Sequence, residues 1–146
     1  DTLHLFTLRD LPNKYPNIRT SFAHGAMLAI ANYGRRIQGY DGRPDIFDDL
    51  QDPRKTLGHE NLYFDTLVHD THTLDLLKKR VGPSQIIAGL DDPFPLGEIE
   101  GVGTSYPGRV LDYAQEIGVL TSQEVNDIWH KNVLDWLGIN KEDFHL

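Results

Sequence analysis

Three short apolar segments of β type recur along the sequence, and each is followed by a helical pattern. The segments cover residues 17–23, 61–65 and 85–90. Strands that alternate with helices are typical of βα units, in which consecutive strands pair in parallel. The sequence therefore predicts an α/β fold built on a parallel sheet.

Apolar spacing predicts two helices between these segments. The first begins near Ala26 and runs to about Ile37, and the second, marked by Leu74 to Val81, ends at Gly82. Residues 39–58 read as a loop rich in glycine and proline. Residues 91–108 form a second loop of this kind, and connections of that length are usually functional or disordered.

A further helix is expected over residues 125–137, where apolar side chains recur at i, i+3, i+4 and i+7. Thr121 and Glu124 have the spacing of a capping box at its start, and Gly138 is a typical C-terminal stop. Trp129 and Trp136 lie seven residues apart on one face, which favours core packing over a cofactor platform.

Composition excludes several classes of function. The chain has 146 residues and a net charge of −8, which disfavours a nucleic-acid surface. It has no cysteine, so a thiolate metal site and a cysteine nucleophile are impossible, and any metal must bind histidine and carboxylate. Residues 1–146 contain no apolar stretch of about 18 residues and no basic leader, so we expect neither a membrane span nor a signal peptide, and a cytoplasmic location.

The ends of the three strands deliver side chains that can do chemistry. His24 follows the first segment, Asp65 ends the second, and Asp91 follows the third, with Asp92 as the neighbouring alternative to Asp91. In an eight-stranded βα barrel, the active site lies where strands end and βα loops begin. Three strands cannot close a sheet, so we expect part of the fold to lie outside this chain.

Three other polar residues leave alternatives open. His69 and His72 are spaced i, i+3 and could share a helix face as metal ligands, although a structural or surface role is the simpler interpretation. Glu98 lies in the second loop, where it could orient loop backbone, hold a residue that itself contacts the site, or simply be solvated.

Four motifs resemble one protein family. These are YFDTLVHD from Tyr63 to Asp70, GLDDPFPLGE from Gly89 to Glu98, FAHG at 22–25, and Gly34-Arg35 eleven residues on. Together they resemble the C-terminal part of the aminocarboxymuconate semialdehyde decarboxylases, in the metal-dependent decarboxylase branch of the amidohydrolase superfamily. The resemblance implies that residues 1–146 supply strands six to eight and the terminal helices of one (β/α)8 TIM-type barrel domain. The N-terminal half, with the family's remaining histidine ligands, would be absent from this chain.

The resemblance also implies roles for three residues. Asp91 would be a metal ligand for Zn²⁺ or another divalent ion, and His24 the catalytic acid and base. Arg35 would bind a substrate carboxylate in the partner subunit of a homodimer, with Arg36 as the alternative for that role.

The implied activity is the non-oxidative decarboxylation of 2-amino-3-carboxymuconate 6-semialdehyde in the kynurenine pathway of tryptophan catabolism. This chain alone would be inactive, and neither nucleic acid nor membrane would be a partner. The alternatives are an aromatic-acid decarboxylase or hydratase of the same superfamily, and a catalytically incomplete fragment that acts as an interaction subunit.

Overall fold

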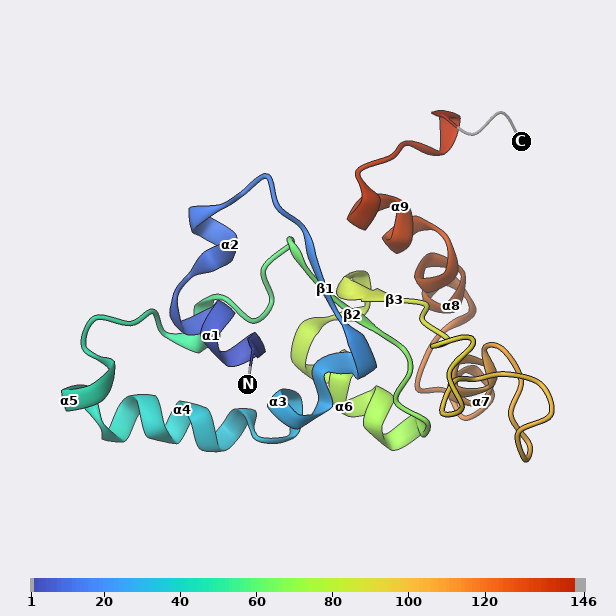
Figure 1. Cartoon of the computed structure of the whole chain (residues 1–146), viewed down its shortest axis with the longest axis horizontal. Helices are drawn as coiled ribbons and strands as arrows, with labels where there is room; N and C mark the ends of the chain where they lie inside the picture. Colours follow the sequence, from blue (N-terminus) through green and yellow to red (C-terminus); the bar gives the residue numbers. More distant parts are fainter. Residues whose placement is uncertain (1, 144–146) are drawn as a thin grey trace.

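Three parallel strands form the central sheet in the computed structural model, which describes residues 2–143 (Figure 1). They are β1 (Thr20–Phe22), β2 (Leu62–Asp65) and β3 (Ile86–Ile87), and they lie side by side in chain order. Phe22 pairs with Phe64, and Phe64 pairs with Ile86. The expected α/β fold with a parallel sheet is confirmed.

Each strand is shorter than the sequence predicts. Ile18 already belongs to a turn, in which its N–H donates to the Tyr15 carbonyl, so β1 begins only at Thr20. Beyond Ile87 the chain leaves the sheet, because Ala88 N–H donates to the carbonyl of Ile128 and Gly89 N–H to the hydroxyl of Thr66. The three predicted strand segments therefore have the correct positions, but each extends beyond the observed strand.

Nine α-helices surround this sheet within residues 2–143. In chain order they are α1 (Thr2–Leu8), α2 (Leu11–Lys14), α3 (Met27–Ala31), α4 (Tyr33–Gly42), α5 (Pro44–Phe47), α6 (Thr71–Val81), α7 (Arg109–Glu116), α8 (Ser122–Trp129) and α9 (Lys131–Leu137). Short 3₁₀ turns cover η1 (Ala23–Ala26), η2 (Pro53–Lys55), η3 (Pro83–Gln85) and η4 (Lys141–Asp143). The sequence reading did not anticipate α1, α2 or α7 as separate helices. No helix among these residues is long and apolar enough to cross a membrane.

The core lies where α3 and α6 pack beside β2, the middle strand. Leu62, Tyr63 and Phe64 are all buried, as expected for a strand covered on both faces. The side chains of Ile30 from α3 and Leu77 from α6 are completely buried with them. This packing fixes the positions at which β1 and β2 end.

The predicted helix from Ala26 to Ile37 is in fact two helices that meet at Asn32. The Asn32 side chain donates to the carbonyl of Leu28 at 2.9 Å, a local hydrogen bond that competes with continued helix. α4 then extends to Gly42, into the region predicted as a loop. Near the end of this helix, the Asp41 carboxylate forms an ion pair with Arg54 at 2.7 Å. The loop prediction is therefore wrong at residues 39–42 and again at α5.

The predicted helix over residues 125–137 also divides, at His130. The Ile128 carbonyl, which a continuous helix would offer to the backbone N–H of Asn132, accepts from Ala88 N–H at 3.1 Å. The Asn132 side chain donates instead to the carbonyl of Ile86 at 2.7 Å and is itself buried. The capping box of Thr121 and Glu124 is confirmed.

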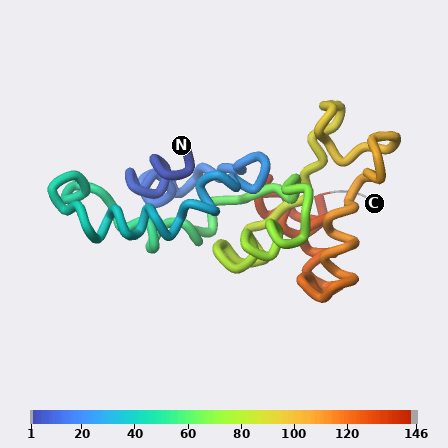
Figure 2. The backbone as a smooth tube through the Cα atoms, turned by 90° about the horizontal axis from the view of Figure 1, so that it is seen from below, coloured from blue at the N-terminus to red at the C-terminus, as the bar shows by residue number. Residues whose placement is uncertain are grey.

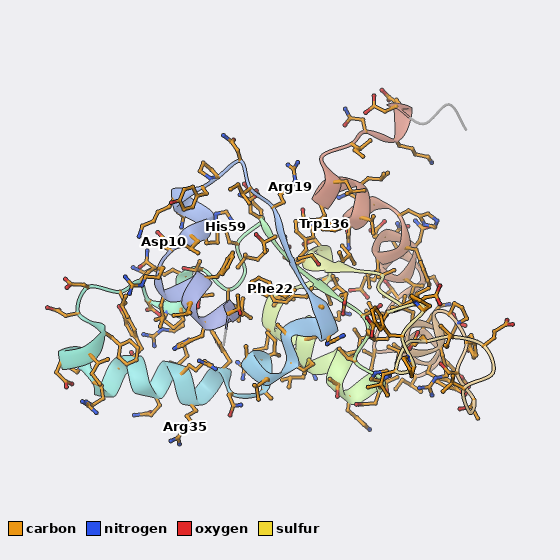
Figure 3. The ribbon with its side chains drawn as sticks, in the orientation of Figure 1. Asp10, Arg19, Phe22, Arg35, His59 and Trp136 are labelled. Atoms are coloured by element: carbon orange, nitrogen blue, oxygen red, sulfur yellow. The ribbon has the colours of Figure 1, made fainter. Side chains whose placement is uncertain are left out.

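The residue directly before β1 contacts the end of α9. Arg19 Nε donates to the Trp136 carbonyl at 2.7 Å, close to the end of α9, and both residues lie between β1 and α9 in Figure 3. Gly138 ends that helix in the left-handed conformation, as predicted. A side chain at 138 would collide with the Arg19 guanidinium, with its Cβ 2.0 Å from Nη2. Trp129 packs against the core, which confirms its packing role.

Candidate active site

The polar residues that end the strands lie on the same edge of the sheet. His24 sits in η1, directly after β1, Asp65 is the last residue of β2, and Asp91 follows β3 by four residues. Because the strands are parallel, all three ends face the edge at which ligands bind in α/β proteins. The 91–108 loop leaves from this edge and projects from the body of the molecule (Figure 2).

His24 and Asp91 form a side-chain pair at this edge. His24 Nε2 lies 3.7 Å from Asp91 Oδ2, and the two side chains are 63% and 30% exposed. The imidazole is thus open to an incoming molecule on one side and faces a carboxylate on the other. The structure brings together two of the three predicted site residues.

Both members of the pair have left-handed backbone conformations. The φ angle is 55° at His24 and 56° at Asp91, values that residues with a Cβ adopt only at an energetic cost. Such strained residues cluster at active sites and ligand clamps, where the surrounding structure holds them in place. The strain at both positions supports the assignment of a functional site here.

Two acidic neighbours of Asp91 point elsewhere. Asp92 is exposed, and it is Asp91 whose carboxylate contacts His24. Glu98 is 2% exposed, and its two oxygens accept from the N–H groups of Gly108 and Val110 at 3.1 and 3.2 Å. Burial raises the pKa of Glu98, against the effect of these hydrogen bonds. Of its predicted roles, the ordering of loop backbone is confirmed.

Arg35 follows His24 by eleven residues and lies on α4. It is exposed on α4, and its side chain points away from the rest of the molecule (Figure 3). Arg36, the alternative, is half-buried, and burial lowers its pKa. Within one copy of the chain the structure does not bring either arginine to His24.

The described residues do not form a metal site by themselves. Zinc takes at least three protein ligands, and residues 2–143 contain no group of three histidine or acidic side chains that could hold a metal ion. His24 and Asp91 provide two donors. His69 and His72 are both exposed, and the carbonyl of His69 accepts from Arg109 Nη2 at 3.3 Å. A metal held at Asp91 would need further ligands from outside these residues.

Sequence reasoning missed the role of the residues that end β2. The Asp65 carboxylate accepts hydrogen bonds from backbone N–H groups and is not part of the His24–Asp91 pair. The Thr66 hydroxyl accepts from Gly89 N–H. An Asp-Thr pair at a strand end was the available signal. This sequence signal indicates a polar edge of the sheet, but it does not indicate which atoms the two side chains contact.

Comparisons with known proteins confirm the resemblance read from the sequence. The chain is 29% identical over 133 residues to the 2-amino-3-carboxymuconate-6-semialdehyde decarboxylase of Dictyostelium discoideum, a match that covers 90% of this chain and 34% of that protein. It is 34% identical over 129 residues to the protein of the same name from Caenorhabditis elegans, with 87% of this chain and 29% of the relative covered. The chain thus spans about a third of the length of these curated relatives.

A solved structure shares the fold. The crystal structure of 5-carboxyvanillate decarboxylase from Sphingomonas paucimobilis matches 94% of this chain and 38% of its own, with a TM-score of 0.65 and 15% sequence identity. No protein-family model matches the sequence.

Proposed function

We propose that this chain carries part of the active site of a metal-dependent decarboxylase that acts on 2-amino-3-carboxymuconate 6-semialdehyde. The observation that carries the proposal is the His24–Asp91 pair, at the carboxyl ends of parallel strands, in a chain similar to decarboxylases of that name. The chain would supply strands six to eight of a (β/α)8 barrel. The remaining two-thirds of the relatives' length would supply the other strands.

His24 is proposed to move the proton of the reaction. Loss of CO₂ breaks a carbon–carbon bond, leaves the electron pair on the substrate carbon, and requires a proton at that carbon. Histidine suits this step because its usual pKa of about 6.5 makes both protonation states available near neutrality. Its 63% exposed side chain leaves room for a substrate beside the imidazole.

Asp91 is proposed as one ligand of Zn²⁺ or another divalent ion, completed by residues outside this chain. Such an ion acts as a Lewis acid toward bound oxygen. The half-buried carboxylate of Asp91 faces the same opening as His24. Because Asp91 is the one metal ligand proposed among residues 2–143, and these contain no group of three that could hold a metal ion, we expect the 146-residue chain alone to be inactive.

Arg35 is proposed to bind a substrate carboxylate in the partner subunit of a homodimer. A guanidinium presents two parallel donors to a carboxylate, which favours arginine for this task. The outward direction of Arg35 on α4 supports a role in a neighbouring subunit, because its side chain points away from the rest of its own chain.

A chimera tests the function. In the Dictyostelium discoideum relative, the segment matched by this chain is replaced by residues 1–146, and CO₂ release is measured with 2-amino-3-carboxymuconate 6-semialdehyde and, separately, with 5-carboxyvanillate. We expect turnover of the first substrate only. Preference for the second would replace the proposal by an aromatic-acid decarboxylase, and a folded chimera inactive on both would reject it.

His24→Ala in the active chimera separates proton transfer from metal binding. We expect turnover to fall by about 10²- to 10⁴-fold, the usual contribution of a general acid or base, with the metal content unchanged. His72→Ala, at an exposed histidine of α6, is the matched control and should keep full activity. Loss of the metal together with activity would make His24 a ligand.

A further inference from the structure

The carboxylate of Asp65 lies between the two backbone segments that carry the site. It ends β2, the middle strand, with β1 on one side and β3 on the other. Its Oδ1 accepts two backbone hydrogen bonds, from Gly25 at 3.0 Å and from Leu67 at 3.1 Å. Gly25 directly follows His24, so this oxygen holds the backbone next to the exposed imidazole.

The segment that Asp65 holds is a strained one. His24, Gly25 and Ala26 have successive φ angles of 55°, 57° and 48°, a left-handed run that is unfavourable for residues with a Cβ. Gly25 is also pressed against the chain after β2, since a Cβ there would lie 2.8 Å from Val68 Cγ1. A run of this kind persists only where surrounding contacts fix it, and the hydrogen bond to Asp65 is one such contact.

The same side chain limits the approach of the chain after β3. A Cβ at Gly89 would lie 2.6 Å from Asp65 Cβ and 3.1 Å from Oδ2, so Gly89 backbone packs directly on this carboxylate. The Thr66 hydroxyl accepts from Gly89 N–H at 3.2 Å. Asp91 lies only two residues further, in its own left-handed conformation.

We propose that Asp65 is a positioning residue, which sets the distance between His24 and Asp91 by holding Gly25 through a hydrogen bond and Gly89 through packing. This assignment rests on the proposed function for its catalytic meaning. The 40-residue separation of Asp65 and Gly25 distinguishes it from a local turn bond, such as the one from Leu67. A metal-binding role is disfavoured because Oδ1 already accepts two N–H groups and Oδ2 lies against Gly89.

Amide hydrogen exchange on the 146-residue chain tests the geometric part without any activity. Asp65→Ala should speed exchange at Gly25 and Leu67 and shift the His24 side-chain resonances, while Thr73 is unchanged. The matched control is Asp70→Ala. The Asp70 carboxylate accepts a 2.8 Å hydrogen bond from Thr73 N–H, at a place separate from the His24–Asp91 pair. This control should affect Thr73 and leave Gly25 and His24 unchanged. Equal effects of both variants on His24 would overturn the proposal.

Asp65→Asn covers the case in which the alanine variant does not fold. An amide oxygen can accept the same two N–H groups, so Asn should keep Gly25 protected and the His24 resonances in place. Loss of Gly25 protection in a folded Asn variant would show that the negative charge is what holds the segment, and would overturn positioning by hydrogen bond geometry.

Kinetics of the chimera test the catalytic part. Asp65→Ala should lower kcat by about 10²-fold with little change in KM, since misplacement by about 1 Å costs this much. Asp65→Asn should restore most of kcat, and both variants should retain metal. Metal loss in both would make Asp65 a ligand instead. An inactive parent chimera would refute the proposed function, while the exchange experiment would still decide the positioning role.

Discussion

At the scale of single residues, the buried carboxylate of Glu98 joins the middle of the long loop to the start of α7. Its two oxygens accept from two different N–H groups, and glutamine offers only one acceptor. Glu98→Gln should therefore lower the free energy of unfolding by about 1–3 kcal/mol, the usual cost of a buried donor without a partner. Urea unfolding measures this.

Glu100→Gln is the matched control for Glu98. Glu100 is exposed in the same loop, so this variant should remain within about 0.5 kcal/mol of the wild type. A Glu98 variant as stable as the control would contradict the assigned role.

His4 gives the stability of the fold a pH dependence. Burial first, and the positive charge of Arg36 second, lower the pKa of His4 below its usual value. The unfolded chain therefore takes up a proton near pH 6.5 that the folded chain does not bind until lower pH. The contribution of neutral His4 to the free energy of unfolding is fully present above about pH 6.5, and it declines as the pH falls through that value.

His4→Asn should remove this contribution. Urea unfolding between pH 7.5 and 5, taken in steps of about half a unit, should show a shallower loss of stability for the variant than for the wild type. His72→Asn, at an exposed position of α6, should follow the wild-type curve. Parallel curves for His4→Asn and the wild type would contradict the assignment.

The sequence placed His24 and Asp91 correctly at the strand ends, and the structure brings them together. The position of a residue after a parallel strand is enough to predict the edge of the sheet that it occupies. The orientation of Asp65 was not predictable in this way. It depends on Gly25 and Gly89 arriving from two other strands, which no local pattern encodes.

At the scale of elements, the spacing between β2 and β3 at their exits depends on a glycine. Gly89→Ala places a Cβ 2.6 Å from Asp65 Cβ, so backbone or carboxylate must move. Overpacking of this kind costs about 1–3 kcal/mol. We expect a loss of that size in thermal unfolding, together with altered His24 resonances.

Gly58→Ala tests whether such a loss is specific. Gly58 is exposed, and a Cβ added there would have nothing within 4 Å, so alanine should be neutral or stabilise the fold by up to about 1 kcal/mol. Comparable losses in both variants would show that close packing at Gly89 is not the cause.

Sequence periodicity predicted where helices lie better than where they break. The apolar spacing continues through Asn32 and through His130, which is why each region reads as one helix. Both helix breaks depend on hydrogen bonds that the spacing of apolar residues does not predict. One is the local bond from the Asn32 side chain, and the other joins Ala88 to Ile128 across 40 residues.

At the scale of the whole molecule, Arg35 and His24 test the proposed dimer. We mix complete chimeric subunits that carry only His24→Ala with others that carry only Arg35→Ala, each inactive as a homodimer. If Arg35 acts in the partner's site, every mixed dimer contains one site with both changes and one with neither. Activity should then return to about a quarter of the wild-type value at equal, random mixing.

Two controls make that mixing experiment decisive. Subunit exchange is followed by native mass spectrometry, and no recovery of activity despite exchange would reject a role across the interface. Full activity of the Arg35→Ala homodimer would reject any part in the reaction, and would leave Arg35 as an exposed residue of α4.

The contact between Arg19 and the end of α9 can form only late in the synthesis of the chain. The two residues of this hydrogen bond are 117 positions apart, so at about 5–20 residues per second a ribosome adds Trp136 about 6–23 s after Arg19. β1 can pair with β2 well before that, since β2 is synthesised earlier. The Arg19 side chain, directly before β1, therefore gains this backbone partner only after nearly the whole described chain has been translated.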